Sequence, residues 1–460
     1  MLRDHLGCPV SGADAPTLRI LDDFIEGFLA YETRAEGVIA GADRNPDCAL
    51  VNVYAGFLWM LLEAPDANLS AAKYLRAAER GFAAVTPREQ LNIALLRAWS
   101  LDDLDSALRI CERISDEFPR DLTVVKLQQY LEFNRGNAPG MLRAALKVLE
   151  SNAGVAYAHG MAAFAFEQCH LLEEAADAAH TALMLKPKEP WAQHALAHVY
   201  LTRGQIDAGA EFLEGRAATW TGLNSFMSTH LWWHLALFYL SQGRGARVIE
   251  LYDRHCWGVA KSYSQDQIGA VSLLARIEFA GFDVGPRWRE LGEHLAVRAA
   301  DTVQPFLTLQ YLYGLAKAGR AEADALLATV RRQARCAPEF TRAAWREAAL
   351  PAAEGMYAHA NGDHDAAWEH LGAALPRLAA VGGSHAQRDL FAQVLLDAAI
   401  RSGRFTAAQH LLESRRATDP DGVPVNEALA TVYARLGLPQ IAARAQARAA
   451  RTRARHQIEA

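Results

Sequence analysis

Cysteine is scarce in this chain of 460 residues, and no two of its six cysteines form a CxxC pair. Such scattered cysteines do not make a disulfide framework, and they suit reduced thiols in a cytosolic protein. Long apolar runs are missing too, because none approaches the roughly 18 residues that a membrane-spanning helix needs. The first residues, MLRDHLGCPVSGADAP, hold no apolar segment of the signal-peptide kind. We therefore expect a cytoplasmic protein without a membrane segment.

An excess of positive charge is also absent. Lysine and arginine number 47 against 53 aspartate and glutamate, which gives a formal net charge of −6. A chain with this balance has no electrostatic footprint for nucleic acid or for an anionic membrane, so we expect neither as a partner. The last segment is locally basic, and we interpret it as the solvated face of a terminal helix. Its arginines are Arg444, Arg448, Arg451, Arg453 and Arg455.

Patterns typical of sheets and of nucleotide binding are not found either. No stretch shows the sustained alternation of Val, Ile and Thr that a sheet needs, and neither GxGxxG nor GxxxxGK[ST] occurs. What is present is an alanine-rich composition in which 51% of residues are hydrophobic and 22% are charged. Because packed amphipathic helices have such a composition, we expect an all-α fold.

Small residues and turn residues recur at a constant spacing. Pro119 and Pro187 each stand 12 residues after a small residue, and Gly136 and Gly204 each stand five residues before an equivalent position. These equivalent positions lie 34 residues apart and are Ala107, Met141, Ala175 and Gly209. The pattern is typical of the tetratricopeptide unit, a helical hairpin of about 34 residues, in which a small residue lets helix B approach helix A.

Beyond Thr221 the spacing loosens, but single glycines continue to mark a turn between paired helices. These are Gly243, Gly281, Gly319, Gly362, Gly403 and Gly437. We expect a TPR-like α-α superhelix (solenoid) of roughly ten helical hairpins, each burying its apolar face against its neighbours. The array should span 71-460, after an N-terminal helical cap at 1-70 with helices near 17–31 and 46–63. We expect loops at 34–47 and 419–424, where Gly, Pro, Asn and Asp cluster.

Two pairs of histidines on neighbouring A helices stand out. Each pair is spaced i, i+4, so both of its rings project from one face of a helix, and the repeat register points that face into the concave groove. The register also aims an acid and two tryptophans at the groove, whereas it places Trp232 in the core. The candidate ligand-binding residues of this groove are Glu167, Trp191, His194, His198, His230, Trp233 and His234.

This cluster is compatible with three chemistries. The four neutral imidazoles can chelate a divalent first-row metal such as zinc, with Glu167 as an oxygen ligand or proton acceptor, although the sequence requires no cofactor. Neither pair has the Glu of HExxH, which disfavours a metalloprotease. The histidines can also act as acids and bases on a small molecule held between Trp191 and Trp233, or can hold an extended peptide. As a fourth interpretation, they hydrogen-bond neighbouring helices and have only a structural role.

A further candidate lies in the segment GGSHAQRD. Ser384 is expected to cap a helix that begins near His385, with Arg388 and Asp389 in its first turn. A helix N-terminus with an arginine can bind an anion, which makes Arg388 a ligand-binding candidate. A salt bridge within or between helices is the favoured interpretation of this arginine.

Several longer stretches are typical of one family. They are RDHLGCPVS (3 to 11), TPREQL (86 to 91), GMAAFAFE (160 to 167), PWAQHALAHVYLTRGQ followed by HLWWHLALFYLSQG and LYDRHCW, and GGSHAQRDLF (382 to 391). In these stretches the chain resembles, nearly end to end, the tetratricopeptide repeat protein 38 family. The resemblance implies a helical-repeat fold and this placement of the four histidines, and it brings no settled activity.

Two functions of different classes follow from these patterns. We predict a helical-repeat binding protein rather than an enzyme, with a groove centred on the His/Trp cluster that takes a peptide or a partner protein. The alternative is an enzyme or carrier that acts on a small molecule at the same cluster, with or without a metal. A groove open along many units would favour the first, and a closed pocket with a strongly perturbed titratable group would favour the second.

Overall fold

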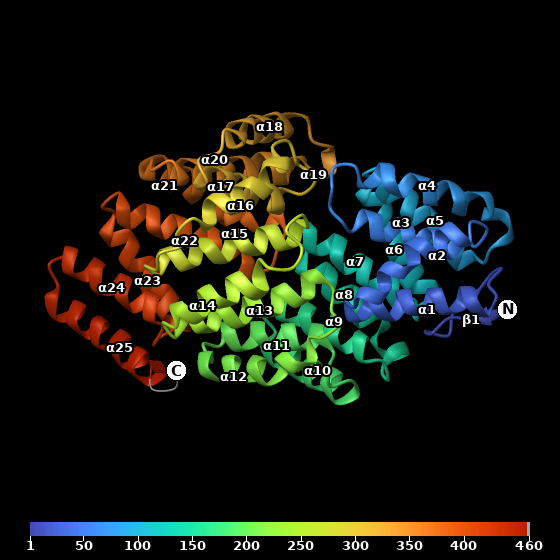
Figure 1. The fold of residues 1–460 in the computed structure, drawn as a ribbon, viewed down its shortest axis with the longest axis horizontal. Helices are drawn as coiled ribbons and strands as arrows, with labels where there is room; N and C mark the ends of the chain where they lie inside the picture. Colours follow the sequence, from blue (N-terminus) through green and yellow to red (C-terminus); the bar gives the residue numbers. More distant parts are fainter. Residues whose placement is uncertain (458–460) are drawn as a thin grey trace. The chain divides into compact units, whose positions relative to one another are not determined.

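The computed structural model describes residues 1–457, and most of them lie in α-helices (Figure 1). In this part of the chain the strands are limited to β1 (Leu2–Arg3) and β2 (Pro9–Val10), which pair antiparallel. The chain divides into two compact units. The first comprises Met1–Ala195 and Thr219–Met227, and the second comprises Leu196–Ala218 and the chain from Ser228 onwards.

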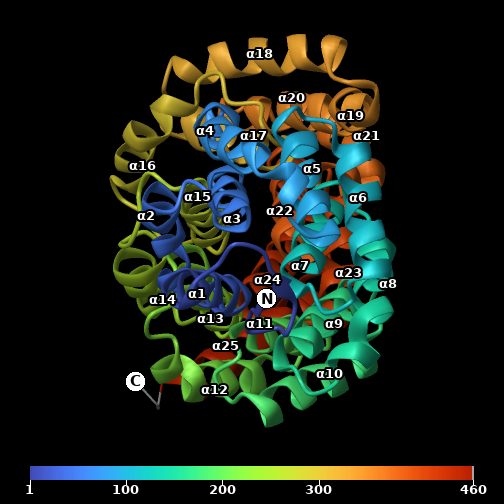
Figure 2. The same ribbon diagram turned by 90° about the vertical axis from the view of Figure 1, so that its right-hand side faces the viewer.

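The helices of the first unit follow the two short strands. They are α1 (Ala15–Ala30), α2 (Gly37–Arg44), α3 (Ala49–Met60), α4 (Ala67–Arg80), α5 (Pro87–Ser100), α6 (Leu104–Glu117), α7 (Leu122–Asn134), α8 (Ala138–Leu149), α9 (Ala156–Gln168) and α10 (Leu172–Leu185). Consecutive helices from α5 to α10 contact each other, and Figure 2 shows these hairpins one after another from cyan to green. One hydrophobic core in this unit extends from Leu6 to Met161, on both sides of residue 70.

The boundary between the units falls inside two helices, α11 (Pro190–Thr202) and α13 (Ser225–Ser241). The second unit also contains α12 (Ile206–Arg216), α14 (Gly245–Leu251), α15 (Ser264–Phe279), α16 (Arg287–Leu295), α17 (Pro305–Lys317), α18 (Glu322–Cys336), α19 (Glu339–Ala343), α20 (Leu350–Ala360), α21 (His364–Ala374), α22 (His385–Arg401), α23 (Phe405–Thr418), α24 (Val423–Arg435) and α25 (Pro439–Gln457). The predicted all-α helical-repeat fold is confirmed.

The predicted small positions lie where paired helices meet. Ala107, Met141, Ala175 and Gly209 are buried in the B helices α6, α8, α10 and α12. At Gly209 a Cβ atom would come within 2.4 Å of the ring of Phe238. The absence of a side chain there therefore lets α12 approach α13, the first helix of the next hairpin.

The turns between paired helices also follow the register. All eight predicted turn glycines, from Gly136 to Gly437, have positive φ. Two further positions in the 34-residue register carry other residues, Asp102 with φ 58° and His170 with φ 58°. The turn therefore requires the left-handed conformation whichever residue occupies it, and glycine adopts that conformation at least cost.

The loop predicted at 34–47 is wrong, because a short 3-10 helix (Thr33–Glu36) and α2 fill most of this segment. One of its two glycines, Gly41, is a packing contact rather than a helix breaker, because a Cβ atom there would lie 2.5 Å from the Ile20 side chain. The predicted loop at 419–424 is confirmed in its main part, since α23 ends at Thr418 and α24 begins at Val423.

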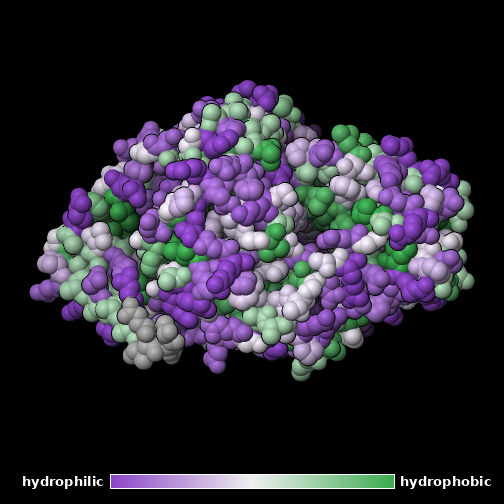
Figure 3. All heavy atoms as spheres, viewed as in Figure 1, coloured by the Kyte–Doolittle hydropathy of each residue, from purple (hydrophilic) through white to green (hydrophobic). Residues whose placement is uncertain are grey.

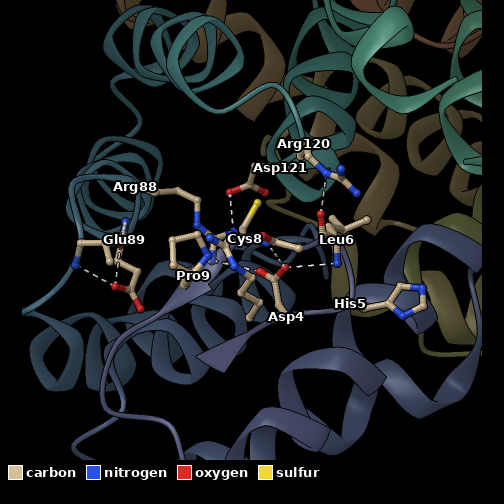
Figure 4. Close-up of polar contacts among 12 residues, drawn as sticks. Asp4, His5, Leu6, Cys8, Pro9, Arg88, Glu89, Arg120 and Asp121 are labelled. Atoms are coloured by element: carbon tan, nitrogen blue, oxygen red, sulfur yellow. Dashed lines mark hydrogen bonds and ion pairs between the residues drawn. The ribbon is translucent and has the colours of Figure 1, made fainter. Parts of the chain in front are cut away.

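The β1–β2 hairpin lies in one of the stretches that carry the family resemblance and contacts a second one at the start of α5 (Figure 4). The Arg88 guanidinium of α5 lies 3.0 Å from Asp4 of the hairpin and 3.3 Å from Asp121 beside α7, and all three side chains are buried. Glu89 accepts a hydrogen bond from the Ser11 backbone, and it also completes the capping box that begins α5. RDHLGCPVS and TPREQL are thus the two sides of one structural contact.

The surface shows no large apolar belt on the face drawn in Figure 3, where hydrophobic residues appear as separate patches among hydrophilic ones. No helix within residues 1–457 has the length and apolar character needed to cross a membrane. All six cysteines are free thiols. The C-terminal arginines make polar contacts along α25, including Arg448 with Asn426 and Arg453 with Glu427.

Candidate functional site

Four imidazole rings form a continuous chain of contacts in the second unit. The ring centroid of His198 on α11 lies 5.3 Å from that of His385 on α22 and 4.6 Å from that of His234 on α13. The His234 ring lies 4.8 Å from that of His230, one helical turn earlier. One ring nitrogen each of His198, His230 and His234 lies within 4.8 Å of the others.

These histidines do not occupy surface positions. The exposed fractions of His198, His230 and His234 are 0%, 8% and 0%. Burial, with a smaller contribution from the charge of His198, lowers the pKa of His230 to about 3. Because burial disfavours the charged form of an imidazole, His230 is neutral over the physiological pH range.

Trp233 fixes the orientation of the α13 rings. Its indole stacks on His230 at 5.3 Å with an interplanar angle of 6°, and it meets His234 edge-on at 4.9 Å. The guanidinium of Arg276 on α15 lies 5.3 Å from the centroid of the same indole. The prediction that Trp232 is core is wrong, because Trp232 is only half-buried and stacks on His255. The reason is that α13 is buried almost all round, so one helical face does not separate core from groove.

A pocket of about 480 Å³ lies beside this chain of histidines, and all of its wall belongs to the second unit. Its charged and histidine side chains are Arg276, His385, Asp389, Asp397, Arg415 and Asp419. Apolar side chains from seven helices complete the wall, among them Leu240, Phe279, Leu396, Leu412 and Val425. The pocket therefore combines an apolar surface with a few charged groups, as small-molecule sites do.

Two guanidinium groups share one carboxylate in the pocket wall. Asp389 accepts hydrogen bonds from Arg415 at 2.5 and 3.0 Å, whereas its distance to Arg276 is 3.9 Å. Arg276 donates instead to the backbone oxygen of Ala386 at 2.9 Å and to Ser272. Burial lowers the pKa of Arg276 to about 10, although Asp389 acts in the opposite direction. The positive charge of Arg276 is thus only partly compensated.

A second polar chain reaches the pocket at Asp397. This carboxylate accepts hydrogen bonds from Arg401 at 2.6 Å and lies 2.8 Å from Nε2 of His359, whose Nδ1 lies 3.2 Å from the buried Tyr313 hydroxyl. Burial raises the pKa of Asp397, but His359 and Arg401 together lower it by more, so that the pKa lies below its ordinary value. Asp397 is therefore a charged acceptor that its neighbours hold in place.

Three of the predicted site residues belong to the first unit. Glu167 is buried on α9 and accepts a hydrogen bond from the Gln168 side chain at 2.6 Å. Trp191 stacks on His194 at 4.5 Å, and the His194 ring lies 5.0 Å from that of Phe164. A joint site of these residues with the histidines of the second unit stays a prediction.

Arg388 is not a pocket residue, and the anion-binding interpretation receives no support from its contacts. Its guanidinium donates to the backbone oxygens of Gly382 and Gly383. The local prediction is otherwise confirmed, since Ser384 caps α22 in a capping box with Gln387. The neighbouring Asp389, rather than Arg388, contributes to the pocket.

Sequence reasoning missed Arg276, Arg415 and the role of Asp389. One signal for Arg276 was available, because it is one of only two charged residues, with Glu278, in the apolar stretch VSLLARIEF. A charged side chain on the buried face of a helix needs a partner or a function. No comparable signal existed for Arg415, which is separated from Arg276 by more than a hundred residues and is followed directly by a second arginine, Arg416.

Comparison with known proteins finds solved structures that are 13–14% identical to this chain. No family model matches the chain. A human IFIT1 dimer with PPP-AAAA is 14% identical, with 98% of this chain and 97% of that chain covered and a TM-score of 0.44. A monomeric IFIT1 mutant with Gppp-AAAA is 13% identical, with 98% of each chain covered and a TM-score of 0.43. Naa15/Naa10 bound to HypK-THB is 13% identical, with coverage of 94% and 68% and a TM-score of 0.26.

Proposed function

We propose that the protein binds a small organic molecule with an apolar body and an anionic group in the pocket of its second unit. The observation that carries this proposal is the pair of guanidinium groups, Arg276 and Arg415, around the carboxylate of Asp389, in a wall that also contains Asp397, Asp419 and many apolar side chains. The volume of about 480 Å³ falls in the range of about 300 to 1,000 Å³ that small-molecule sites occupy.

The electrostatics of Arg276 favour an anionic ligand. Arg276 is 2% exposed, and the lowering of its pKa means that burial destabilises its charge more than Asp389 stabilises it. A carboxylate, sulfonate or phosphate at the pocket wall would supply the missing negative charge. His385 lines the same pocket and would offer a hydrogen bond or accept a proton from the ligand.

This proposal keeps the small-molecule ligand of the alternative drawn from the sequence, but it places that ligand in the neighbouring pocket rather than at the His cluster itself. The first hypothesis, a groove that takes a peptide or partner protein, needs the His/Trp cluster on an open surface, whereas His198, Trp233 and His234 are buried. Membership of the tetratricopeptide repeat protein 38 family and the absence of nucleic-acid partners stay predictions. The free cysteines are in keeping with the cytoplasmic location that the sequence predicts.

Titration with anilinonaphthalene sulfonate tests the proposal, because this fluorescent probe has the proposed combination of an aromatic body and an anionic group. We expect saturable binding at one site on the wild-type protein. Arg276→Gln should weaken binding by about tenfold or more, since hydrogen bonds to charged groups contribute about 1.5–3 kcal/mol. Ala428→Phe, which places a ring in the pocket wall, should block binding.

Arg298→Gln is a matched control, because Arg298 is also buried in the second unit but pairs with Asp301 at 3.0 Å and lies outside the pocket wall. It should lower the melting temperature and leave probe binding unchanged. Equal binding by the wild type, Arg276→Gln and Ala428→Phe would contradict the proposal. Capture of peptides from an array by a wild-type protein that does not bind the probe would support the groove hypothesis instead.

A further inference from the structure

Three imidazoles of the second unit bring potential metal ligands together, separately from the charged wall of the pocket. They are His198 of α11 and the i, i+4 pair His230 and His234 of α13. One ring nitrogen of each lies within 4.8 Å of the other two, and all three residues are buried. A metal-bound set of imidazoles on a tetrahedral ion has nitrogens about 3.3 Å apart, as follows from bonds of about 2.0–2.1 Å. Small rotations about the side-chain bonds therefore suffice to bring all three nitrogens to bonding distance of one ion.

The local sequence explains how the three rings meet. The spacing of His230 and His234 places both rings on one face of α13. Trp233 then restricts them, since it stacks on one and meets the other edge-on. On α11 the small residue Ala197 is fully buried beside His198, which leaves room for close approach of the helices. The rings are thus held near each other before any ion binds, which lowers the entropy cost of coordination.

The surroundings suit a borderline metal rather than a hard one. Imidazole nitrogen is a preferred ligand of Zn²⁺ and of its neighbours in the first transition row, whereas Mg²⁺ and Ca²⁺ prefer oxygen. As packing groups, three imidazoles are poor replacements for leucine, because each buries polar nitrogen atoms that aliphatic side chains lack. Each of the three rings can give one nitrogen atom to a shared ion.

We propose that His198, His230 and His234 form a three-histidine site for a divalent first-row transition metal, of which Zn²⁺ is the type. Three protein nitrogens leave a fourth position in a tetrahedral shell, as in catalytic zinc sites. His385 lies next to His198, at a ring distance of 5.3 Å, and lines the pocket. The histidine set therefore lies next to the pocket wall at His385.

The test begins with protein free of any histidine tag, stripped by dialysis against a chelator and then titrated with ZnCl₂ in competition with a fluorescent chelator. We expect one Zn²⁺ per chain. His198→Gln and His234→Gln should each weaken affinity by at least about tenfold, since even partners outside the ligand shell contribute that much. His255→Gln is the matched control, because His255 also stacks on a tryptophan in the second unit but lies outside the set.

X-ray absorption of the wild-type zinc complex decides the question without any variant that has to fold. The proposal requires a shell with three imidazole nitrogens at about 2.0–2.1 Å. A shell rich in oxygen or sulfur, no retained zinc, or unchanged affinity in folded His198→Gln and His234→Gln would each overturn it. The metal site does not depend on the proposed small-molecule function. If the wild-type protein binds zinc but not the probe, only the small-molecule function is overturned. If it binds the probe but not zinc, only the metal site is overturned.

Discussion

Arg88 should be the residue on which the N-terminal hairpin depends most. Its guanidinium is 1% exposed and is the ion-pair partner of both Asp4 and Asp121 (Figure 4). The change Arg88→Met removes the charge, keeps most of the side-chain volume and leaves two carboxylates buried without it. Removal of one partner from a buried ion pair costs about 3–5 kcal/mol, and we expect a loss in the upper part of this range.

Hydrogen exchange measured by mass spectrometry is the appropriate assay, because the chain forms two units and need not unfold in one step. Faster exchange should appear in peptides that cover the hairpin and α5, together with a lower melting temperature. Arg97→Met is the matched control on the same helix, since Arg97 pairs with Glu79 on the surface, where such a pair contributes about 0–1 kcal/mol.

A second set of variants separates charge from packing. Asp4→Asn keeps an oxygen for the backbone N–H groups of Leu6 and Cys8 but removes the negative charge. When Asp4→Asn and Asp121→Asn are both added to Arg88→Met, the protein should regain much of its stability, because no buried charge is left unpaired. Burial already raises the pKa of Asp4 and Arg88 lowers it, so loss of Arg88 should raise it further. The deficit of Arg88→Met should then shrink as pH falls from neutral toward the raised pKa of Asp4, because the carboxyl takes up a proton there.

The reasoning would be refuted by an Arg88→Met protein as stable as Arg97→Met, with unchanged exchange in the hairpin. A deficit that the two asparagine substitutions fail to reduce would show that the packing of the guanidinium, rather than its charge, holds the hairpin.

Three further predictions concern the repeat and the pocket. Ala175→Leu should destabilise the protein by about 1–3 kcal/mol in thermal or urea unfolding, because Ala175 is fully buried where two helices cross. Gly136→Ala should cost about 1 kcal/mol and Asp102→Gly should be neutral or stabilising, since both turn positions are left-handed; the opposite order would contradict the turn assignment. Burial raises the pKa of Asp389, but the arginines of the pocket lower it below its ordinary 3.8, so its ion pair stabilises the fold above that pH and is lost as pH falls below it. The difference in melting temperature between the wild type and Asp389→Asn should therefore narrow below about pH 3.8, and a constant difference would count against the ion pair.

The repeat was predictable because its signals are local. A small residue such as Ala175 and a turn glycine such as Gly204 act within one hairpin, where sequence spacing fixes spatial position. The same local signals gave a wrong loop prediction between residues 34 and 47, because a glycine can mark either a turn or a close packing contact. Gly41 permits close packing against Ile20, and only the tertiary contact distinguishes that use from a turn.

The candidate site divides in the same way. The i, i+4 spacing of His230 and His234 located one face of one helix, and the repeat register correctly indicated the neighbourhood of His198. The repeat register could not predict burial, because the exposure of a helix depends on which other elements of the unit pack over it. Trp232 and Trp233 illustrate this limit. The register predicted Trp232 in the core and Trp233 in the groove, whereas Trp233 is buried and Trp232 is half-buried.

The sequence by itself determined the helices, their pairing and the turns, because these depend on interactions between residues close in the chain. The tertiary structure alone decided the pocket. Arg276 on α15 lies more than a hundred residues before Asp389 on α22 and Arg415 on α23. The partly compensated charge of Arg276 arises only when packing removes it from water and brings the other two beside it. Desolvation and distance set the strength of such charges, and neither quantity is encoded in the spacing of residues along one helix.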